Sequence, residues 1–237
     1  MLNLELLKNE ACDIGYLLSD EQLLKLDQYA QLLVEWNEKI NLTAITEPDD
    51  IVMKHFIDSF LLLNHIQTKE PFSLIDVGTG AGFPSLPCKI ICDSMQLTML
   101  DSLNKRINFL NEVVQNVGVK AQCIHGRAEE SGKQPELREK FTYATARAVA
   151  HLRELSEYCL PFVKVGGYFV ALKGFEIEEE LEEAKAAIKV LGGQIVDVKK
   201  YELKDSGKRA IVVVKKISQT PTKYPRSFGK MKKQPIM

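Results

Sequence analysis

The sequence lacks the features that mark membrane proteins, disulfide-rich proteins and metalloproteins. No segment has the roughly 18 consecutive apolar residues that a membrane-spanning helix needs. The five cysteines include no C-x-x-C pair, and there is no H-E-x-x-H run or carboxylate cluster to hold a metal. The first residues also lack the charged, apolar and cleavage regions of a signal peptide. We therefore expect a cytoplasmic protein with reduced cysteines, no metal and no membrane contact.

Neither sign of charge is in excess overall, but the charge is unevenly distributed. The formal net charge of the 237 residues is −1. From Lys199 onward there are twelve Lys and Arg and two acidic residues, a net charge of +10, which leaves −11 for the first 198 residues. A basic C-terminal region on an acidic protein predicts contact with a polyanion such as nucleic acid. A tail that only keeps the protein soluble is the alternative.

Helices are predicted for the first 70 residues. Ser19 and Gln22 have the spacing of a capping box, and apolar residues follow at helical intervals. A second helix is expected to begin at Pro48 and to run to about His65. Further helices are expected at 105–117, 151–160 and 176–191.

Seven strands alternate with these later helices and indicate an α/β fold. Their expected ranges are 72–77, 96–101, 121–125, 141–147, 167–172, 194–203 and 209–217. Only the short connection 204–208 joins the last two strands, so they must form an antiparallel hairpin at the end of a mostly parallel sheet. We predict a helical N-terminal extension (1–70), an α/β domain (71–217) and a basic tail (218–237) that is extended until it binds a partner.

A glycine turn follows the first strand. The run 73–84, SLIDVGTGAGFP, places Gly78, Gly80 and Gly82 directly after the apolar strand and its terminal Asp76. Such glycines allow a positive φ and a close approach of the backbone to a ligand, and the following helix offers unpaired N–H groups. The G-x-G-x-G spacing differs from the G-x-G-x-x-G of dinucleotide enzymes. It resembles the first motif of S-adenosylmethionine-dependent methyltransferases, and a glycine turn in another α/β domain is the alternative.

Polar side chains stand at the carboxyl ends of the next strands. Asp101 ends the second strand, where a carboxylate can accept hydrogen bonds from both ribose hydroxyls of a nucleoside. Ala128 and Glu129 follow the third strand, where contacts with an adenine edge belong in such folds, and Arg147 ends the fourth. Ligands gather at the carboxyl ends of doubly wound sheets, so these residues form one candidate site, although each alone could be an ordinary surface residue.

Lys105 and Arg106 begin the helix after the second strand. Basic residues in a first helical turn oppose the helix dipole. Their placement therefore hints at a phosphate contact, and a solubilising surface role is an equal alternative.

Three residues of the second predicted helix suggest a hydrolytic triad at first sight. His55, Asp58 and Ser59 lie within about one turn of a single helix, and nothing supplies an oxyanion hole. We therefore reject a triad and expect a polar helix face near the glycine turn.

Taken together, the motifs resemble the small-subunit ribosomal RNA methyltransferase G family, also called glucose-inhibited division protein B. The resemblance runs from about Trp36 to the C-terminus. The segments that carry it are 36–37, 41–45, 55–59, 76–84, 100–102, 105–106, 127–129, 146–148, 172–174 and 224–226. One position departs from the family pattern, because Ser85 stands where glycine is usual after the proline of the glycine motif.

The resemblance implies a Rossmann-like fold and S-adenosylmethionine-dependent methylation of a guanine N7 in 16S ribosomal RNA, either free or in the small ribosomal subunit. The residues that it places against the cofactor are Gly78 and Gly80 of the glycine turn, Phe83, Asp101, Ser102, Leu103, Ala128, Glu129 and Arg147. Arg147 and Lys173 are expected to position the reactants, and Lys105, Arg106 and Arg226 to contact RNA. The sequence gives no oligomeric state.

The residues at the fourth strand are compatible with this chemistry. Guanine N7 carries a lone pair and no proton, so its methylation needs no general base and can rest on positioning. The sequence Thr145–Ala148 lacks the acid or amide before Pro-Pro of adenine-amine methylases and the cysteine of cytosine-C5 enzymes. Two alternatives stay open: a methyltransferase for a small molecule or protein, and a cofactor-sensing RNA-binding protein without catalysis.

Overall fold

A seven-stranded sheet forms the centre of the protein. The computed structural model describes residues 1–67, 70–147, 150–204 and 207–236. The strand order is β3-β2-β1-β4-β5-β7-β6. The strands are β1 (Phe72–Val77), β2 (Met95–Asp101), β3 (Ala121–His125), β4 (Phe141–Arg147), β5 (Val163–Gly174), β6 (Gly193–Leu203) and β7 (Gly207–Lys216). Strands β1 to β5 are parallel, and β7 lies antiparallel between β5 and β6, which confirms the predicted sheet and its terminal hairpin.

One strand is longer than predicted. The sequence predicts that the fifth strand begins at Gly167, whereas β5 begins at Val163. The chain passes through Gly166 at a φ of 88°, and the pairing with β4 shifts register there. Glycine permits this positive φ. Gly166 therefore suggests the end of a strand in the sequence, but it lies in an irregular part of the continuous strand β5.

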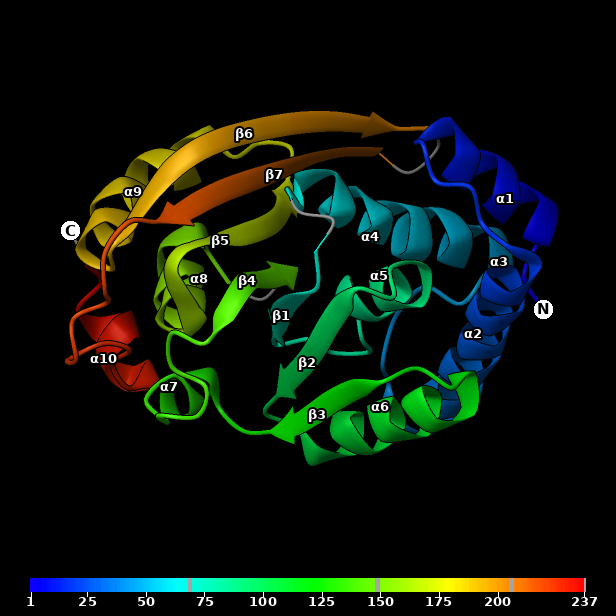
Figure 1. Cartoon of the computed structure of the whole chain (residues 1–237), viewed down its shortest axis with the longest axis horizontal. Coiled ribbons are helices and arrows are strands. Elements are labelled where there is room, and N and C mark those ends of the chain that lie inside the picture. The colour runs from blue at the N-terminus through cyan, green and yellow to red at the C-terminus, as the bar shows by residue number, and fades with distance from the viewer. Residues whose placement is uncertain (68–69, 148–149, 205–206, 237) are drawn as a thin grey trace.

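Helices cover both faces of the sheet (Figure 1). The helices before and between the first strands are α1 (Leu4–Asp13), α2 (Asp20–Ile40), α3 (Pro48–Asp50), α4 (Asp58–Phe60), α5 (Ser85–Ile91) and α6 (Asn104–Val117). All of them except α3 contribute to a single apolar cluster with one face of the sheet. The later helices are α7 (Ala128–Ser131), α8 (Leu152–Cys159), α9 (Glu178–Val190) and α10 (Phe228–Lys233), and α8 and α9 build a second cluster on the opposite face. In the described part of the chain, no helix is long and apolar enough to cross a membrane.

Local signals set the ends of the N-terminal helices. The Ser19 side chain accepts a hydrogen bond from the Gln22 backbone while the Gln22 side chain accepts one from Ser19, so the predicted capping box is present. The predicted helix from Pro48 to His65 is one helical run of changing pitch. Between α3 and α4 it has a π-helical segment, η1 (Ile51–Ile57), and after α4 it ends in a 3₁₀ turn, η2 (Leu61–His65). π-Helical turns such as η1 are frequent at functional sites.

The C-terminal segment is folded, so the prediction of an extended tail is wrong. It turns back on the α8 side of the sheet and forms α10, whose Met231 is 1% exposed. The Arg138 guanidinium donates hydrogen bonds to the backbone oxygens of Thr220 and Tyr224, at 2.7 and 2.9 Å. These partners lie more than 80 positions from Arg138 in the chain. Because a guanidinium satisfies several carbonyls at once, one distant side chain can order a segment that has no strong pattern of its own.

Candidate functional site

Two cavities open at the carboxyl edge of the parallel strands. The strand order reverses between β1 and β4, which is where doubly wound sheets bind ligands. The β1–β3 cavity, of about 410 Å³, lies over the ends of β1, β2 and β3. Its lining residues are Val77, Gly78, Leu100, Asp101, Ser102, Gly126, Arg127, Ala128, Glu129, Ala150, Glu154, Tyr158, Phe228 and Lys232. The β4–β5 cavity, of about 360 Å³, lies over the ends of β4 and β5 and is bounded by the helical run 48–65 and by β7.

The glycine turn has the conformation that its sequence predicts. Gly78, Gly80 and Gly82 have φ values of 72°, 62° and 98°. A Cβ at Gly82 would lie 2.6 Å from the Tyr29 hydroxyl oxygen, so glycine there is needed for packing, whereas a Cβ at Gly80 would meet nothing within 4 Å. Gly78 lines the β1–β3 cavity. The turn therefore combines one glycine required by the core with one that borders the cavity.

Asp101 anchors this cavity. Its side chain is 2% exposed, and its Oδ2 accepts a hydrogen bond from the Gly80 backbone N–H at 2.9 Å. Its Oδ1 accepts one from the Leu103 backbone N–H at 2.9 Å, and Arg106 Nη1 lies 3.3 Å from Oδ2. The carboxylate is thus held between the two loops that follow β1 and β2, with acceptor capacity left over for a ligand hydroxyl.

The predicted cofactor residues divide into three groups. Five of them line the β1–β3 cavity: Gly78, Asp101, Ser102, Ala128 and Glu129. Gly80 and Leu103 bind the Asp101 carboxylate through their backbone N–H groups. Phe83 and Arg147 lie elsewhere, because Phe83 is 6% exposed and packs among the rings of the helical layer while Arg147 lines the β4–β5 cavity.

Asp76 is a buried acid at the end of β1. Its Oδ2 accepts hydrogen bonds from Thr79 Oγ1 at 2.9 Å and from Ser85 Oγ at 2.6 Å, and the side chain is fully buried. Within the described residues, Oδ1 has no hydrogen-bond partner. Burial raises the pKa of this carboxyl to about 7, against the lowering effect of these hydrogen bonds. Ser85, the departure from the family pattern, therefore stabilises an acid that a glycine would leave with one bond fewer.

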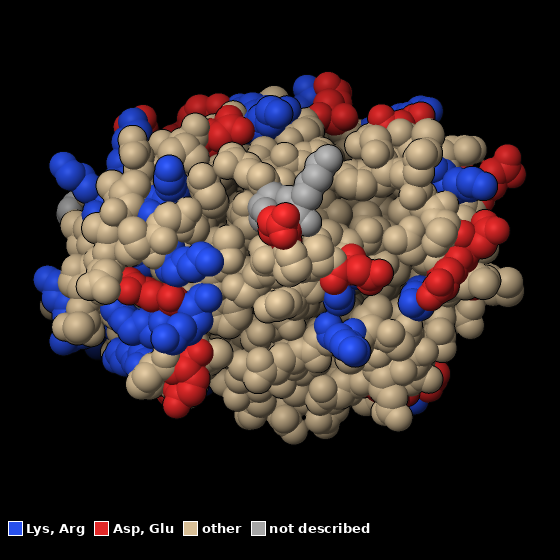
Figure 2. Space-filling view, viewed as in Figure 1, with Lys and Arg blue, Asp and Glu red and all other residues tan. Residues whose placement is uncertain are grey.

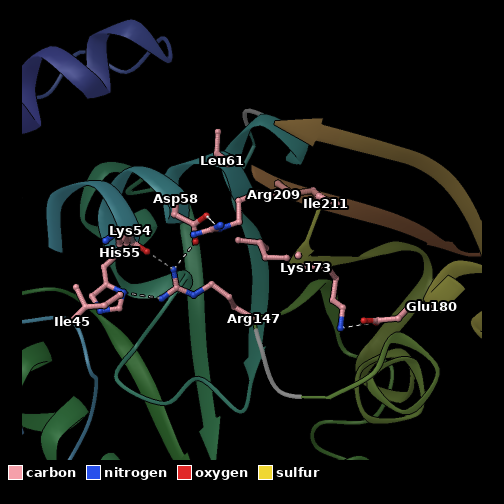
Figure 3. A pocket seen from close by; sticks show the side chains of 13 residues that line it. Ile45, Lys54, His55, Asp58, Leu61, Arg147, Lys173, Glu180, Arg209 and Ile211 are labelled. Atoms are coloured by element: carbon pink, nitrogen blue, oxygen red, sulfur yellow. Dashed lines mark hydrogen bonds and ion pairs between the residues drawn. The ribbon is translucent and has the colours of Figure 1, made fainter. Parts of the chain in front are cut away.

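Asp58 is the central anion of the β4–β5 cavity (Figure 3). Its Oδ2 accepts a hydrogen bond from Arg147 Nη1 at 2.8 Å, and its Oδ1 accepts one from Arg209 Nε at 3.0 Å. The Asp58 residue is 4% exposed, whereas the two arginine side chains are 17% and 31% exposed. The carboxylate therefore fixes two guanidinium groups at the cavity wall and offsets their charge.

His55 packs between Phe83 and Arg147, beside this network. Its ring stacks on Phe83 with centroids 4.3 Å apart, and its Nδ1 lies 3.3 Å from Arg147 Nη2. Burial, and next the Arg147 charge, lower the pKa of His55 to about 3. Because the guanidinium can only donate, Nδ1 accepts and Nε2 carries the proton, which it donates to Thr43 Oγ1 at 3.0 Å.

The predicted polar helix face is confirmed. Ser59 Oγ donates its hydrogen bond to the His55 backbone oxygen, not to the His55 ring, so the three residues do not form a triad. Instead, His55 and Asp58 project from the η1–α4 turns toward Arg147 (Figure 3).

The predicted positioning and RNA-binding cations have different surroundings. Lys173 is 8% exposed in its side chain, lies 2.7 Å from Glu180 Oε2 and donates to the Ala150 backbone oxygen. The Arg226 guanidinium binds both carboxylate oxygens of Glu157, an acid that is 2% exposed, and donates to the Gln234 backbone oxygen. These contacts anchor Arg226 and engage three of its five N–H donors, so its predicted contact with RNA stays a prediction.

Sequence reasoning missed several residues of the two cavities, four of which come from the C-terminal third of the chain. Arg209 in β7 and Glu180 in α9 reach the β4–β5 cavity from distant parts of the chain. Phe228 and Lys232 in α10 reach the β1–β3 cavity. No local motif marks any of them, because each enters its site through tertiary packing.

This geometry defines the class of the protein. A glycine turn after β1, an acid at the end of β2 and an antiparallel last strand pair on a doubly wound sheet together define the fold of S-adenosylmethionine-dependent methyltransferases. Solved structures agree: a S-adenosylmethionine-dependent methyltransferase from Aquifex aeolicus aligns with a TM-score of 0.52 over 71% of this chain and 93% of its own, at 20% identity. TrmN from Thermus thermophilus aligns with a TM-score of 0.54 over 68% of this chain and 48% of its own, at 16% identity.

The chain belongs to the rRNA small subunit methyltransferase G (GidB) family, whose model matches residues 22–212. It is 51% identical over 234 residues to the ribosomal RNA small subunit methyltransferase G of Clostridium botulinum (strain Alaska E43 / Type E3), covering 98% of both chains. It is 49% identical over 233 residues to the protein of that name from Alkaliphilus metalliredigens (strain QYMF), again over 98% of both. The protein is thus an enzyme that methylates ribosomal RNA with S-adenosylmethionine, and the two alternatives left open by the sequence are set aside.

The β1–β3 cavity fits this cofactor. Its wall has no side chain at Gly78, and the Asp101 carboxylate keeps acceptor capacity for a ligand hydroxyl. The unpartnered Asp76 Oδ1 at the end of β1 leaves one buried acceptor next to the glycine turn. No cluster of three or more His, Cys, Asp or Glu that could hold a metal occurs in the part of the chain that the structure describes.

Proposed function

We propose that the enzyme methylates N7 of a specific guanosine in 16S ribosomal RNA, with the small ribosomal subunit as its partner and without a metal. The observation that carries this proposal is the state of the β4–β5 cavity. Of its two carboxylates, Asp58 is bound by two arginines and Glu180 by Lys173, and its imidazole, His55, is neutral with both ring nitrogens engaged. None of these groups is free to take a proton, and guanine N7 has none to give.

In this proposal the two cavities divide the work. The β1–β3 cavity holds the nucleoside part of the cofactor, with Asp101 accepting from the ribose and the 126–129 loop facing the adenine. The bound cofactor supplies an electrophilic methyl group on its sulfonium. The β4–β5 cavity holds the guanine, so that N7 reaches the methyl group at the switch point between β1 and β4.

Arg147 and Lys173 are the positioning residues of the proposal. Guanine presents O6 as a hydrogen-bond acceptor beside N7. Arg147 is held in place by Asp58 and lies 5.1 Å over the Phe83 ring, and Lys173 is held by Glu180. A donor fixed in this way orients a base without reorganisation, which is the main requirement of a reaction that depends on alignment.

RNA contacts are assigned to basic groups that remain accessible. Lys105 is exposed on the first turn of α6, beside the β1–β3 cavity, and Arg106 is partly exposed while it contacts Asp101. More Lys and Arg side chains gather at the end of the molecule where α10 lies, with acidic side chains between them (Figure 2). Such contacts position an RNA through its phosphates and do not select the base.

The proposal is tested with S-adenosylmethionine labelled in its methyl group. Purified enzyme is mixed with small ribosomal subunits, and separately with naked 16S RNA, from cells that lack the activity. The RNA is then reduced and cleaved at N7-methylguanine. We expect label at one guanosine and cleavage at that nucleotide. Label at another atom or in several nucleotides would contradict the proposal, and label only in naked RNA would contradict the subunit as partner.

A further inference from the structure

The C-terminal helix α10 forms part of the wall of the β1–β3 cavity. Phe228 and Lys232 line this cavity together with Ala128 and Tyr158, although they lie about 100 residues from the 126–129 loop in the sequence. The two residues are four positions apart and therefore occupy one face of the helix. The segment whose charge suggests a role in RNA binding thus contributes to a different site.

Several buried contacts fix α10 at this place. Arg226, just before the helix, binds Glu157 of α8 with Nε at 2.9 Å from Oε1 and Nη2 at 2.7 Å from Oε2. Met231 is 1% exposed and packs in the apolar cluster of α8 and α9. The segment between β7 and α10, here called the strap, is bound by the Arg138 guanidinium, which donates a hydrogen bond to the Tyr224 backbone oxygen. The helix is therefore a built part of the fold, held on one face by the core and open on the other.

The open face of α10 carries an aromatic ring that the protein core does not bury. Phe228 is 49% exposed, whereas most phenylalanines of this chain lie in the core. Lys232 Nζ lies 3.0 Å from Glu154 Oε2 and 6.0 Å from the centre of the Phe228 ring, so the charged group at the cavity edge is neutralised by α8. An uncovered aromatic surface at a cavity wall suits a flat heterocycle, because every such base has a π-face that can stack on the ring.

We propose that Phe228 is a cofactor-binding residue, whose ring forms one wall of the adenine subsite, and that the Arg226–Glu157 ion pair holds it there. The inference rests on the assignment of the β1–β3 cavity to the nucleoside of S-adenosylmethionine. Phe228 shares this cavity with Asp101 and Ser102 at the end of β2 and with Ala128 after β3. An RNA base stacked on the same ring would have to enter the space that these residues enclose, so the cavity favours the cofactor.

The test compares substitutions by calorimetry with S-adenosylhomocysteine and, separately, with adenosine as probes. For Phe228→Ala we expect an affinity about tenfold weaker for both probes, and for Phe228→Tyr an affinity within about twofold of the wild type. Phe175→Ala is the matched control, since Phe175 lies 4.1 Å from Lys200 Nζ and lines neither cavity. Arg226→Ala, which releases the strap, should weaken both probes in the same direction. Circular dichroism and thermal melts identify any variant that does not fold.

Three outcomes would overturn the inference. Unchanged affinity of folded Phe228→Ala for both probes, while Asp101→Asn loses binding, would remove Phe228 from the subsite and leave the cavity assignment intact. Unchanged affinity in both variants would overturn the cavity assignment as well. The RNA affinity of Phe228→Ala and its salt dependence should equal those of the wild type, and a loss confined to RNA would show that the ring serves the nucleic acid instead.

Discussion

The two cavities at the carboxyl edge of the sheet are neighbours of similar volume but are built in opposite ways. The β1–β3 cavity is formed mainly by the consecutive loops after β1, β2 and β3, with α8 and α10 completing its wall, and its Asp101 carboxylate accepts hydrogen bonds from backbone N–H groups. The β4–β5 cavity is assembled from four separate segments, and its polar groups, led by Asp58, are tied to one another in ion pairs. Most of the first cavity can therefore be predicted from local sequence, whereas the second forms only when distant segments of the chain fold together.

The difference also follows the chemistry. A cofactor with the same atoms in every turnover can be recognised by fixed backbone geometry at a glycine turn. In the proposed division of roles, a base delivered by a large RNA needs donors that are already oriented when it arrives, and the ion pair of Asp58 with Arg147 would provide this order. Substitutions in the first cavity should therefore act on cofactor affinity, and those in the second on stability and methyl transfer.

The sharpest test of the first cavity is Gly78→Asp. Gly78 lines the cavity at a φ of 72°, so the new side chain is strained and places a second negative charge near Asp101. We expect calorimetry to show S-adenosylhomocysteine binding weakened at least about 1000-fold, or about 4 kcal/mol. Gly118→Asp is the matched control, because Gly118 has a φ of 68° and a Cβ there meets nothing within 4 Å. Binding by the Gly78 variant equal to that of the control would contradict the assignment.

The second cavity is tested most strongly by Asp58→Asn. The substitution leaves Arg147 and Arg209 without their shared anion in a largely buried network. Breaking such a pair by removing one partner costs about 3 kcal/mol of unfolding free energy, and the displaced Arg147 should slow methyl transfer at saturating cofactor. Urea denaturation and single-turnover transfer measure the two effects. Cofactor affinity should change less than threefold, or about 0.7 kcal/mol, and a large loss there would show that the cavities are not separate.

A surface ion pair provides the reference for that measurement. Lys185 and Glu182 of α9 lie 2.5 Å apart with side chains 59% and 71% exposed. Because water screens such pairs, Glu182→Gln should change the unfolding free energy by less than about 0.5 kcal/mol. An equal loss in the Glu182 and Asp58 variants would mean that burial of the Asp58 network adds nothing to its stability.

The sequence predicts the fold and the first cavity well for a physical reason. Strand ends, the glycine turn and Asp101 follow from short-range periodicity and from the rule that ligands meet parallel strands at their carboxyl ends. Five of the nine predicted cofactor residues line one cavity accordingly. The sequence predicts that Arg147 lies at the end of its strand, but it does not identify the residues that Arg147 contacts, because Asp58 and Arg209 are 89 and 62 residues away in the chain.

The C-terminal segment shows where composition misleads. Five basic residues, three prolines and no acid in 218–237 predict a solvated tail. The acids that order it, Glu157 and Glu139, belong to other elements: Glu157 binds Arg226, and Glu139 accepts a hydrogen bond from the Thr220 backbone N–H at 2.8 Å. Two of the five basic residues, Arg226 and Lys232, are thus paired with acids of α8, and only the fold reveals these pairs.

A smaller effect is expected from the pH dependence of stability at His55. Its pKa falls from 6.5 to about 3 on folding, chiefly because it is buried. Between these pH values the unfolded chain binds more protons than the folded one, so this group lowers stability as pH falls below 6.5 and contributes nothing to the slope above it. His55→Gln should remove this dependence. The free energy of unfolding that the variant loses between pH 7 and pH 5 should therefore be about 1–2 kcal/mol smaller than the wild-type loss. Parallel stability curves for the two proteins in urea would contradict a neutral, buried His55.

The smallest effect that we expect is on RNA binding, where Lys105, an accessible cation, is compared with Arg226, which is anchored by an ion pair. Lys105 is exposed at the start of α6, and no ion pair with it is found among the described residues, whereas the Arg226 side chain is bound to Glu157. If Lys105 contacts a phosphate, Lys105→Ala should weaken RNA binding a few-fold and lower the slope of log affinity against log salt by about one. Arg226→Ala should lower the melting temperature and leave that slope unchanged. The reverse pattern, with the slope altered only in the Arg226 variant, would mean that the strap opens on the RNA and that its ion pair with Glu157 is exchanged for a phosphate.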